Sequence, residues 1–225
     1  MPRPLELSAR AVALKPSLTL AIGAQAKALQ RAGRDICSLS AGEPDFDTPD
    51  FIVEATRQAL RDGITRYGPA AGDPELRAAV AEKLSSGNGI ATSPEQVLIT
   101  NGGKQAIYNL FQVLLNPGDE VLLPAPYWLS YPEMAALAGA KVKLIPTQAG
   151  EGFRLDLTAV EAAISPRSRL LVLNSPGNPT GRVMERQELE GVAELVRRHP
   201  QLLVMSDEIY EFLLAEGEQH HSFAA

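Results

Sequence analysis

From residue 96 onward, short apolar runs alternate with longer amphipathic stretches, and this alternation limits the possible folds more than any other feature. The apolar runs are residues 97–99, 120–123, 142–145, 170–173 and 202–205. Between them, apolar residues recur at helical spacing in residues 103–115, 128–137, 157–164 and 185–198. Such alternation indicates βαβ units. The sequence therefore predicts an α/β fold with a mostly parallel sheet and helices on both faces.

Residues 1–45 differ from the rest of the chain, and we expect them to form a separate segment. Residues 20–32 have helical composition, and residues 36–40 form a short run that predicts a strand. In the turn-rich loop that follows, Thr48 and Pro49 are typical of the N-cap and the first position of a helix over 49–61. A further helix is predicted over 73–84. The predicted domain boundary lies between residues 45 and 46.

Charge and cysteine content argue against several classes of protein. The chain has 21 Lys and Arg against 27 Asp and Glu, and a net charge of −6 is atypical of a general nucleic-acid binder. No apolar run approaches the length of a membrane span, and the first ten residues lack the order of a signal peptide. Cys37 is the only cysteine, which fits a reducing cytoplasm. The three histidines and Cys37 lack zinc-site spacing, so we expect no metal.

The last apolar run, residues 202–205, stops abruptly at Ser206 and Asp207. Ligands of open α/β sheets lie just beyond the carboxyl ends of the strands, so Asp207 is a candidate carboxylate at the floor of a site. It would need a cationic partner there, because an unpaired buried charge is costly. Asp207 could equally be the N-cap of a following helix. Tyr210, three residues later, would face the same side if a helix begins at Asp207.

Two further motifs follow predicted strands. Gly102, Gly103 and Lys104 lie between a strand and a helix, where glycines allow close backbone approach and the helix start offers free N–H groups for a phosphate. The motif is neither a P-loop nor Gly-x-Gly-x-x-Gly, and a simple tight turn competes with the phosphate interpretation. Trp128, the only tryptophan, could stack on an aromatic ligand. Taken alone, that motif favours a half-buried aromatic at a helix start.

The segment 174–181, Asn-Ser-Pro-Gly-Asn-Pro-Thr-Gly, follows the strand predicted over 170–173. Two X-Pro bonds within five residues make a rigid turn, and either bond could be cis. Such a turn would aim the amide of Asn178 with little freedom. The motifs together supply an anion cradle, an aromatic plate, an amide, a carboxylate and a phenol beyond strand ends. They predict a pocket for a flat, phosphorylated heteroaromatic ring.

From about Lys15 to its last residues, the sequence resembles the class I aminotransferases of the aspartate aminotransferase family, which are pyridoxal-phosphate enzymes of fold type I. The resemblance rests on six motifs in order, at residues 41–46, 67–69, 102–104, 126–128, 178–181 and 206–210. It implies that residues 1–45 are an N-terminal arm with a segment of the small domain. It also implies that residues 46–225 are an incomplete fold type I large domain.

The resemblance implies contacts to the ring of pyridoxal 5'-phosphate. Asp207 would pair with the pyridine nitrogen and keep the ring an electron sink. Asn178 and Tyr210 would donate hydrogen bonds to the phenolic oxygen. Trp128 would stack on the ring, and Trp128 and Asn178 would also contact the substrate.

The remaining implied roles concern the phosphate and the substrate. The backbone of Gly103 and Lys104 would hold the phosphate. Tyr67 would reach the phosphate of the neighbouring subunit, because sites of this family lie at a homodimer interface. Gly42 would lie against the substrate carboxylate. The side chain of Lys104 resembles that of the branch acting on acidic substrates, which favours aspartate-like amino donors.

The family's catalytic lysine, in a Ser-x-x-Lys setting, has no counterpart, since the last lysine of the chain is Lys143. We therefore expect a chain truncated before the Schiff-base lysine and the substrate-binding arginine, and inactive by itself. The function that the resemblance implies is amino transfer between an amino acid and a 2-oxo acid. The alternatives are a non-catalytic fragment that binds a cofactor or a partner, and another enzyme of the same cofactor class such as a β-lyase.

Overall fold

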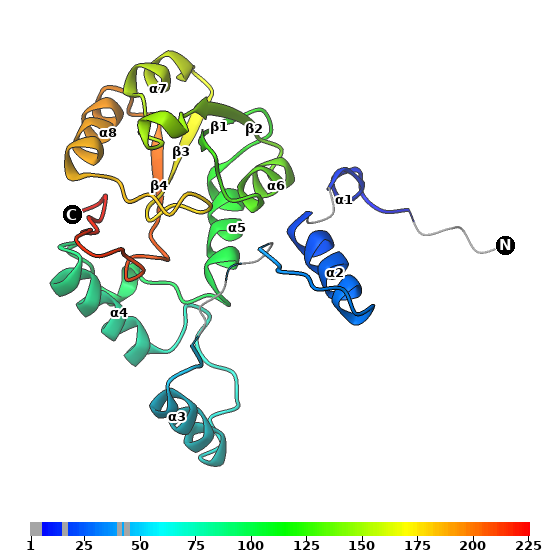
Figure 1. Ribbon diagram of the computed structural model, residues 1–225. Helices are drawn as coiled ribbons and strands as arrows, with labels where there is room; N and C mark the ends of the chain where they lie inside the picture. The colour runs from blue at the N-terminus through cyan, green and yellow to red at the C-terminus, as the bar shows by residue number, and fades with distance from the viewer. Residues whose placement is uncertain (1–5, 15–17, 40–41, 43–45) are drawn as a thin grey trace. The chain divides into compact units, whose positions relative to one another are not determined.

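The computed structural model describes residues 6–14, 18–39, 42 and 46–225 (Figure 1). The described residues belong to two units, one that includes residues 6–12 and 69–225 and one that lies within residues 13–68. None of the described helices is both long and apolar enough to cross a membrane.

The unit of residues 13–68 contains two long helices, α2 (Leu18–Arg31) and α3 (Asp50–Arg61). The short helix α1 (Ala9–Ala13) belongs to the other unit except for its last residue. The predicted helices 20–32 and 49–61 are thus confirmed, with Pro49 rather than Thr48 as the N-cap of α3. The strand predicted over 36–40 is wrong for residues 36–39, which are irregular, and Ser40 lies outside the described residues. An extended run becomes a strand only when another strand pairs with it, and no described strand does so here.

The larger unit contains a four-stranded sheet in the order β2-β1-β3-β4, in which all paired strands are parallel. The strands are β1 (Glu120–Ala125), β2 (Lys141–Pro146), β3 (Ser168–Asn174) and β4 (Leu203–Asp207). The mostly parallel sheet expected from the sequence is therefore confirmed. Residues 97–99, also predicted as a strand, pair with none of these four. Instead, the N–H of Ile99 donates to the carbonyl of Ala71 at 2.9 Å.

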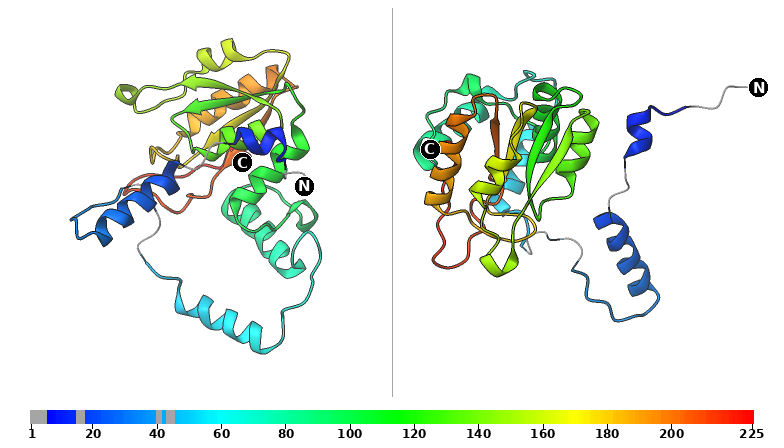
Figure 2. Two further views of the ribbon diagram at one scale, coloured as in Figure 1. Left: turned by 90° about the vertical axis from the view of Figure 1, so that its right-hand side faces the viewer. Right: turned by 90° about the horizontal axis from the view of Figure 1, so that it is seen from above.

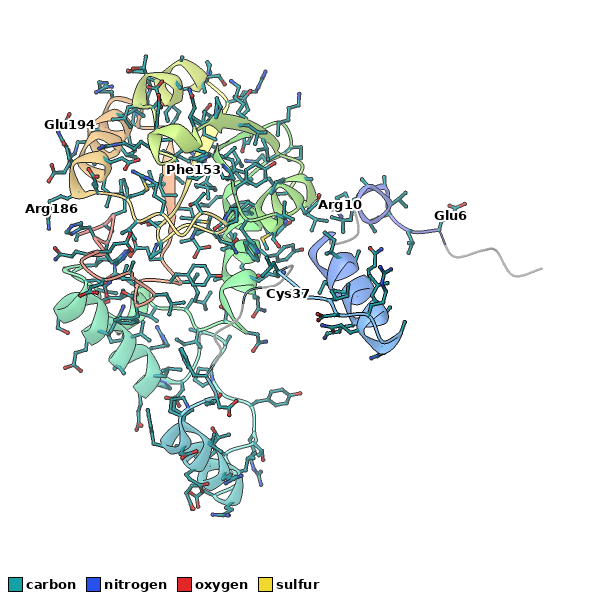
Figure 3. The ribbon with its side chains drawn as sticks, viewed as in Figure 1. Glu6, Arg10, Cys37, Phe153, Arg186 and Glu194 are labelled. Atoms are coloured by element: carbon teal, nitrogen blue, oxygen red, sulfur yellow. The ribbon has the colours of Figure 1, made fainter. Side chains whose placement is uncertain are left out.

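After residue 69, five α-helices precede the sheet in the chain or alternate with its strands. They are α4 (Pro74–Gly87), α5 (Gly103–Leu114), α6 (Ser130–Leu137), α7 (Leu157–Ala163) and α8 (Arg186–Arg198). On α8, Leu189, Val192 and Leu195 are buried, whereas Arg186 and Glu194 lie on the exposed side (Figure 3). The 3.6-residue periodicity read from the sequence thus identifies the face that packs on the sheet.

Side chains from alternate positions of the strands build two separate cores. In β1, Val121 and Leu123 pack with α5 and α6, whereas Leu122 packs with α7 and α8. The helices accordingly cover both faces of the sheet (Figure 2). Strands buried on both faces are apolar throughout, which is why the sequence shows continuous runs rather than alternation. Because the strands are parallel, their carboxyl ends meet at one edge of the sheet.

At the opposite edge, Glu120 begins β1 as a buried carboxylate. It accepts hydrogen bonds from Ser165 Oγ at 2.6 Å and Arg167 Nη2 at 3.1 Å, and Lys143 Nζ lies 3.1 Å away. The Ser165 hydrogen bond outweighs burial, and with the two cations it lowers the pKa of Glu120 to about 2. These contacts anchor the segment before β3 to the start of β1 and β2.

We expect Glu120→Gln to destabilise the chain by about 2 kcal/mol at pH 7, because it removes a buried, charge-assisted hydrogen-bond network. A carboxyl whose pKa is lowered on folding stabilises the protein above its unfolded-state pKa of about 4.5, and this contribution is lost as pH falls toward about 2. The difference between the two chains should therefore shrink between pH 5 and pH 3, measured by urea unfolding. Glu82→Gln, at an exposed position on α4, is the control. A difference that stays constant over this pH range would contradict the assignment.

Candidate functional site

A pocket of about 190 Å³ lies at the carboxyl ends of β3 and β4. Its lining is made by Gly103, Lys104, Ile107, Trp128, Tyr131, Asn174, Asn178, Asp207, Ile209 and Tyr210. The structure thus brings together six residues that the sequence singled out, although they come from four separate segments of the chain. Parallel topology explains the convergence, because each segment follows a strand or begins a helix at the same edge.

The start of α5 forms one wall of this pocket. Gly102 precedes the helix with φ +81°, and an added Cβ at Gly103 would meet nothing within 4 Å. The first N–H groups of a helix have no partner within it, and among the described residues those of Gly103 and Lys104 have none elsewhere. Open space in front of unpaired N–H groups, at the positive end of a helix, suits a phosphate.

Trp128 forms an aromatic wall just before α6. It is half-buried, and the ammonium of Lys104 lies 5.0 Å from the centroid of its ring. The ring of Tyr131 meets it edge-on, at 5.3 Å and 85°. The sequence motif alone favours a half-buried aromatic at a helix start. Trp128 is such a residue, and it also lines the pocket.

Asp207 is the last residue of β4, and the hydroxyl of Tyr131 donates to its Oδ2 at 2.6 Å. The N–H of Ile209 lies 3.3 Å from Oδ1, a long contact. Burial, followed by the charge of Asp207, raises the pKa of Tyr131, so this phenol remains the donor. Residues 209–212 form a turn rather than a helix, so the alternative role of Asp207 as a helix N-cap is wrong. Asp207 and Tyr210 nevertheless line the same pocket.

Hydrogen bonds to the carboxylate of Glu208 fix the segment that carries Tyr210. This carboxylate accepts hydrogen bonds from Ser206 Oγ at 2.7 Å, Ser222 Oγ at 2.7 Å and the N–H of Phe223 at 3.1 Å. His220 Nε2 lies 3.0 Å away. Burial alone would raise the pKa of Glu208, but these hydrogen bonds hold the pKa below its ordinary value. Glu208 thus fixes one side of the turn while Tyr210 lines the pocket on the other.

The turn that carries Asn178 is fixed by a second asparagine. Asn174 Oδ1 accepts from the N–H of Asn178 at 2.8 Å, and Asn174 Nδ2 donates to the carbonyl of Asp207 at 3.0 Å. Both proline bonds of the turn, Ser175–Pro176 and Asn178–Pro179, are cis. Asn174 therefore ties the end of β4 to the arm that presents Asn178.

Behind this turn lies a buried ion pair. Arg182 Nη1 donates to Glu188 Oε1 at 3.1 Å, and Arg182 Nη2 contacts Glu188 Oε2. The N–H of Leu155 donates to the same carboxylate at 2.9 Å. The N–H of Gly177 donates to the carbonyl of Arg182 at 2.9 Å, which connects the ion pair to the turn.

Two predicted site residues, Gly42 and Tyr67, belong to the unit of residues 13–68, and both are exposed. Their contacts with a cofactor or substrate stay predictions. Residues 41 and 43–45 of the same motif lie outside the described residues. Within the described part of the chain, no group of three or more His, Cys, Asp or Glu side chains could hold a metal ion.

Sequence reasoning missed Tyr131 and Asn174. Asn174 could have been found by the argument that selected Asp207, because it ends the neighbouring strand and lies beside Asp207 in the register. Tyr131 offers a weaker signal, since its spacing of three from Trp128 places both on one side of a helical turn. Nothing local shows that its hydroxyl reaches a residue 76 positions away.

Comparison with known proteins adds independent information. Residues 34–224 match the family model for class I and II aminotransferases. A bifunctional aspartate aminotransferase and glutamate/aspartate-prephenate aminotransferase of Petunia hybrida is 52% identical over 221 residues, 98% of this chain and 46% of the relative. The aspartate/prephenate aminotransferase of Thermus thermophilus is 53% identical over 212 residues, 94% of this chain and 55% of the relative.

Solved structures agree with these relatives. The aspartate aminotransferase of Thermus thermophilus with maleate superposes with a TM-score of 0.93 at 51% identity, covering 97% of this chain and 57% of that one. The aspartate aminotransferase of Rhizobium meliloti gives a TM-score of 0.93 at 37% identity, covering 98% and 55%. The chain therefore spans about half the length of the relatives that it matches.

Proposed function

Because the chain belongs to the class I and II aminotransferases, we propose that its pocket binds pyridoxal 5'-phosphate for amino transfer between an amino acid and a 2-oxo acid. The observation that carries this proposal is the convergence of the Asp207 carboxylate, the Trp128 ring and the free N–H groups of α5 on one pocket. These three groups suit the ring nitrogen, the ring face and the phosphate of one ligand.

Each residue has a distinct task toward the cofactor. Asp207 holds a proton at the ring nitrogen, because a carboxylate favours a nearby positive charge. Asn178 and Tyr210 donate hydrogen bonds to the phenolic oxygen, and Trp128 covers the ring face and excludes water. The N–H groups of Gly103 and Lys104 hold the phosphate. When bound, pyridoxal phosphate supplies the carbonyl carbon that exchanges the amino group and the ring that accepts electrons.

These 225 residues supply non-covalent contacts to the cofactor. The family's Schiff-base lysine has no counterpart among them, since no lysine follows Lys143. These contacts would equally serve a second candidate function, binding of the cofactor or of a partner without catalysis. Cofactor binding is common to both candidates, and only turnover separates them.

The single tryptophan provides the test of cofactor binding. Adding pyridoxal phosphate to the chain should quench the fluorescence of Trp128 saturably, because the ring would stack on the indole. Inorganic phosphate should compete with it weakly. Quenching that rises linearly with concentration, without saturation, would refute the proposed site.

For the substrate, we propose a dicarboxylic amino donor such as aspartate and a 2-oxo acid acceptor such as prephenate. The printed names of the relatives support this choice, as does the exposed ammonium of Lys104 beside Trp128. A lysine at the mouth of the pocket suits a second carboxylate of the substrate.

Lys104→Ala should therefore lower the affinity of the cofactor-loaded chain for aspartate about tenfold, the effect of one charge-assisted hydrogen bond. Affinity for alanine should stay the same, because alanine lacks the second carboxylate. Isothermal titration calorimetry measures both. Lys141→Ala, at the start of β2 on the opposite edge of the sheet, is the matched control. An equal loss for aspartate and alanine would rule out this role for the Lys104 side chain.

We also propose assembly as a homodimer in the cytoplasm, with Tyr67 reaching the phosphate in the second subunit and Gly42 lying against the substrate carboxylate. The support is the resemblance of residues 41–46 and 67–69 to the family motifs. In the same way, the division into an arm with a small-domain segment over 1–45 and a cofactor-binding domain over 46–225 rests on sequence alone.

A further inference from the structure

The side chain of Tyr131 contacts two walls of the pocket, Asp207 and Trp128. Its hydroxyl donates to Asp207 Oδ2 at 2.6 Å, and its ring meets Trp128 edge-on at 5.3 Å. It is 1% exposed and packs with Met134 and Ala135 in the core beneath α6. A side chain so confined has few alternative rotamers, so it can hold its two neighbours in fixed positions.

The geometry at Asp207 is asymmetric. Oδ2 receives a short hydrogen bond from Tyr131, whereas Oδ1 receives only the long contact of 3.3 Å from the N–H of Ile209. The terminal torsion of an aspartate is broad, so the carboxylate would rotate readily without the first hydrogen bond. With that hydrogen bond in place, Oδ1 remains available to a ligand that enters the pocket.

We propose that Tyr131 is a positioning residue that orients the Asp207 carboxylate toward the ring nitrogen of the cofactor and braces Trp128 against the ring face. This inference rests on the proposed function, because it concerns the same ligand. Tyr131 acts through Asp207 and Trp128. Its hydroxyl is therefore expected to influence recognition of the ring nitrogen and to leave recognition of the phosphate unchanged.

Tyr131→Phe tests this role, because it removes the hydroxyl and keeps the ring that packs on Trp128. The readout is the ratio of affinities for pyridoxal phosphate and for its 1-deaza analogue, in which a C–H group replaces the ring nitrogen. We expect the substitution to reduce this ratio about tenfold, the effect of a lost hydrogen bond to a charged group. Affinity for the 1-deaza analogue should stay the same. An unchanged or increased ratio would overturn the proposal.

Two further chains make the test specific. Tyr108→Phe removes a phenol from α5 at a position that is 39% exposed and does not line the pocket, so the ratio should not change. In a chain that already carries Asp207→Asn, adding Tyr131→Phe should leave the ratio unchanged, because the negative charge that Tyr131 orients toward the ring nitrogen is gone. A full tenfold loss in that background would mean that Tyr131 does not act through Asp207.

A spectroscopic measurement serves if Tyr131→Phe does not fold. In the unsubstituted chain, the hydroxyl proton of Tyr131 should be protected from exchange and visible by NMR, because it is buried in a short hydrogen bond. Its resonance should shift when pyridoxal phosphate is added, and much less with the 1-deaza analogue. Equal shifts with both ligands would overturn the proposal.

The outcomes separate this inference from the function on which it rests. If the unsubstituted chain binds the two ligands equally, the assignment of Asp207 to the ring nitrogen fails. If it prefers pyridoxal phosphate and Tyr131→Phe keeps the full preference, the role of Tyr131 fails while the proposed cofactor site stands.

Discussion

Replacing Asp207 by asparagine is expected to weaken binding of pyridoxal phosphate about 30-fold, equivalent to about 2 kcal/mol, the range of a hydrogen bond between charged groups. The amide has the size of the carboxylate and can still accept the hydroxyl of Tyr131, so the pocket should keep its shape. What is lost is the negative charge that favours a protonated ring nitrogen. Equilibrium dialysis with the two chains measures the difference.

Inorganic phosphate provides the internal comparison, because its proposed contacts are the N–H groups of α5 and not Asp207. Its affinity should be equal in both chains. Asp156→Asn is the matched control: Asp156 caps α7 by accepting from the N–H of Thr158 at 2.9 Å, and asparagine caps a helix equally well. A loss of phosphate affinity that matches the loss of pyridoxal phosphate would show that Asp207→Asn damages the fold rather than the ring contact.

The second large effect is expected in the core beneath the phosphate cradle. Phe111 of α5 is 0% exposed and packs against the apolar face formed by β1 and β3. Phe111→Ala should lower the free energy of unfolding by about 3–5 kcal/mol, because it removes a large buried ring and leaves a cavity. Urea unfolding followed by circular dichroism measures the change. Val113→Ala, on the same helix at a position that is 81% exposed, should change stability by less than about 0.5 kcal/mol.

Because α5 also presents the N–H groups of Gly103 and Lys104, loosening its packing should weaken phosphate binding together with stability. A Phe111→Ala chain that unfolds like the unsubstituted chain would contradict the packing described here. If Phe111→Ala lowers stability but leaves the affinity for pyridoxal phosphate unchanged, phosphate binding at the start of α5 does not depend on the packing of Phe111.

Much of the sheet could be predicted from the sequence, because strands buried on both faces leave continuous apolar runs such as residues 170–173. The two wrongly predicted strands have a common cause. Residues 36–39 and 97–99 have strand-like composition, but no described strand pairs with them, and pairing is not encoded locally. A helix beginning at Asp207 was one of two alternatives, and the chain forms a turn there, in which Glu208 accepts hydrogen bonds from Ser222 and Phe223.

The candidate site was predictable to a similar degree. Gly103, Trp128, Asn178 and Asp207 all adjoin a strand end or a helix start, so topology alone brings them to one edge. Tyr131 lies within a helix and lines the pocket, and its hydrogen bond to Asp207 depends on how α6 packs in the core that it shares with α5 and the sheet. Contacts of this kind follow from tertiary packing and leave no local signal.

The central claim is that the pocket at the carboxyl ends of β3 and β4 holds pyridoxal phosphate. The most direct test is a crystal structure of the chain grown with pyridoxal phosphate. It should show the ring nitrogen within hydrogen-bonding distance of Asp207, the phosphate at the N–H groups of Gly103 and Lys104, and the ring on Trp128. Density for the ligand at another place, or an empty pocket at saturating ligand, would contradict the account.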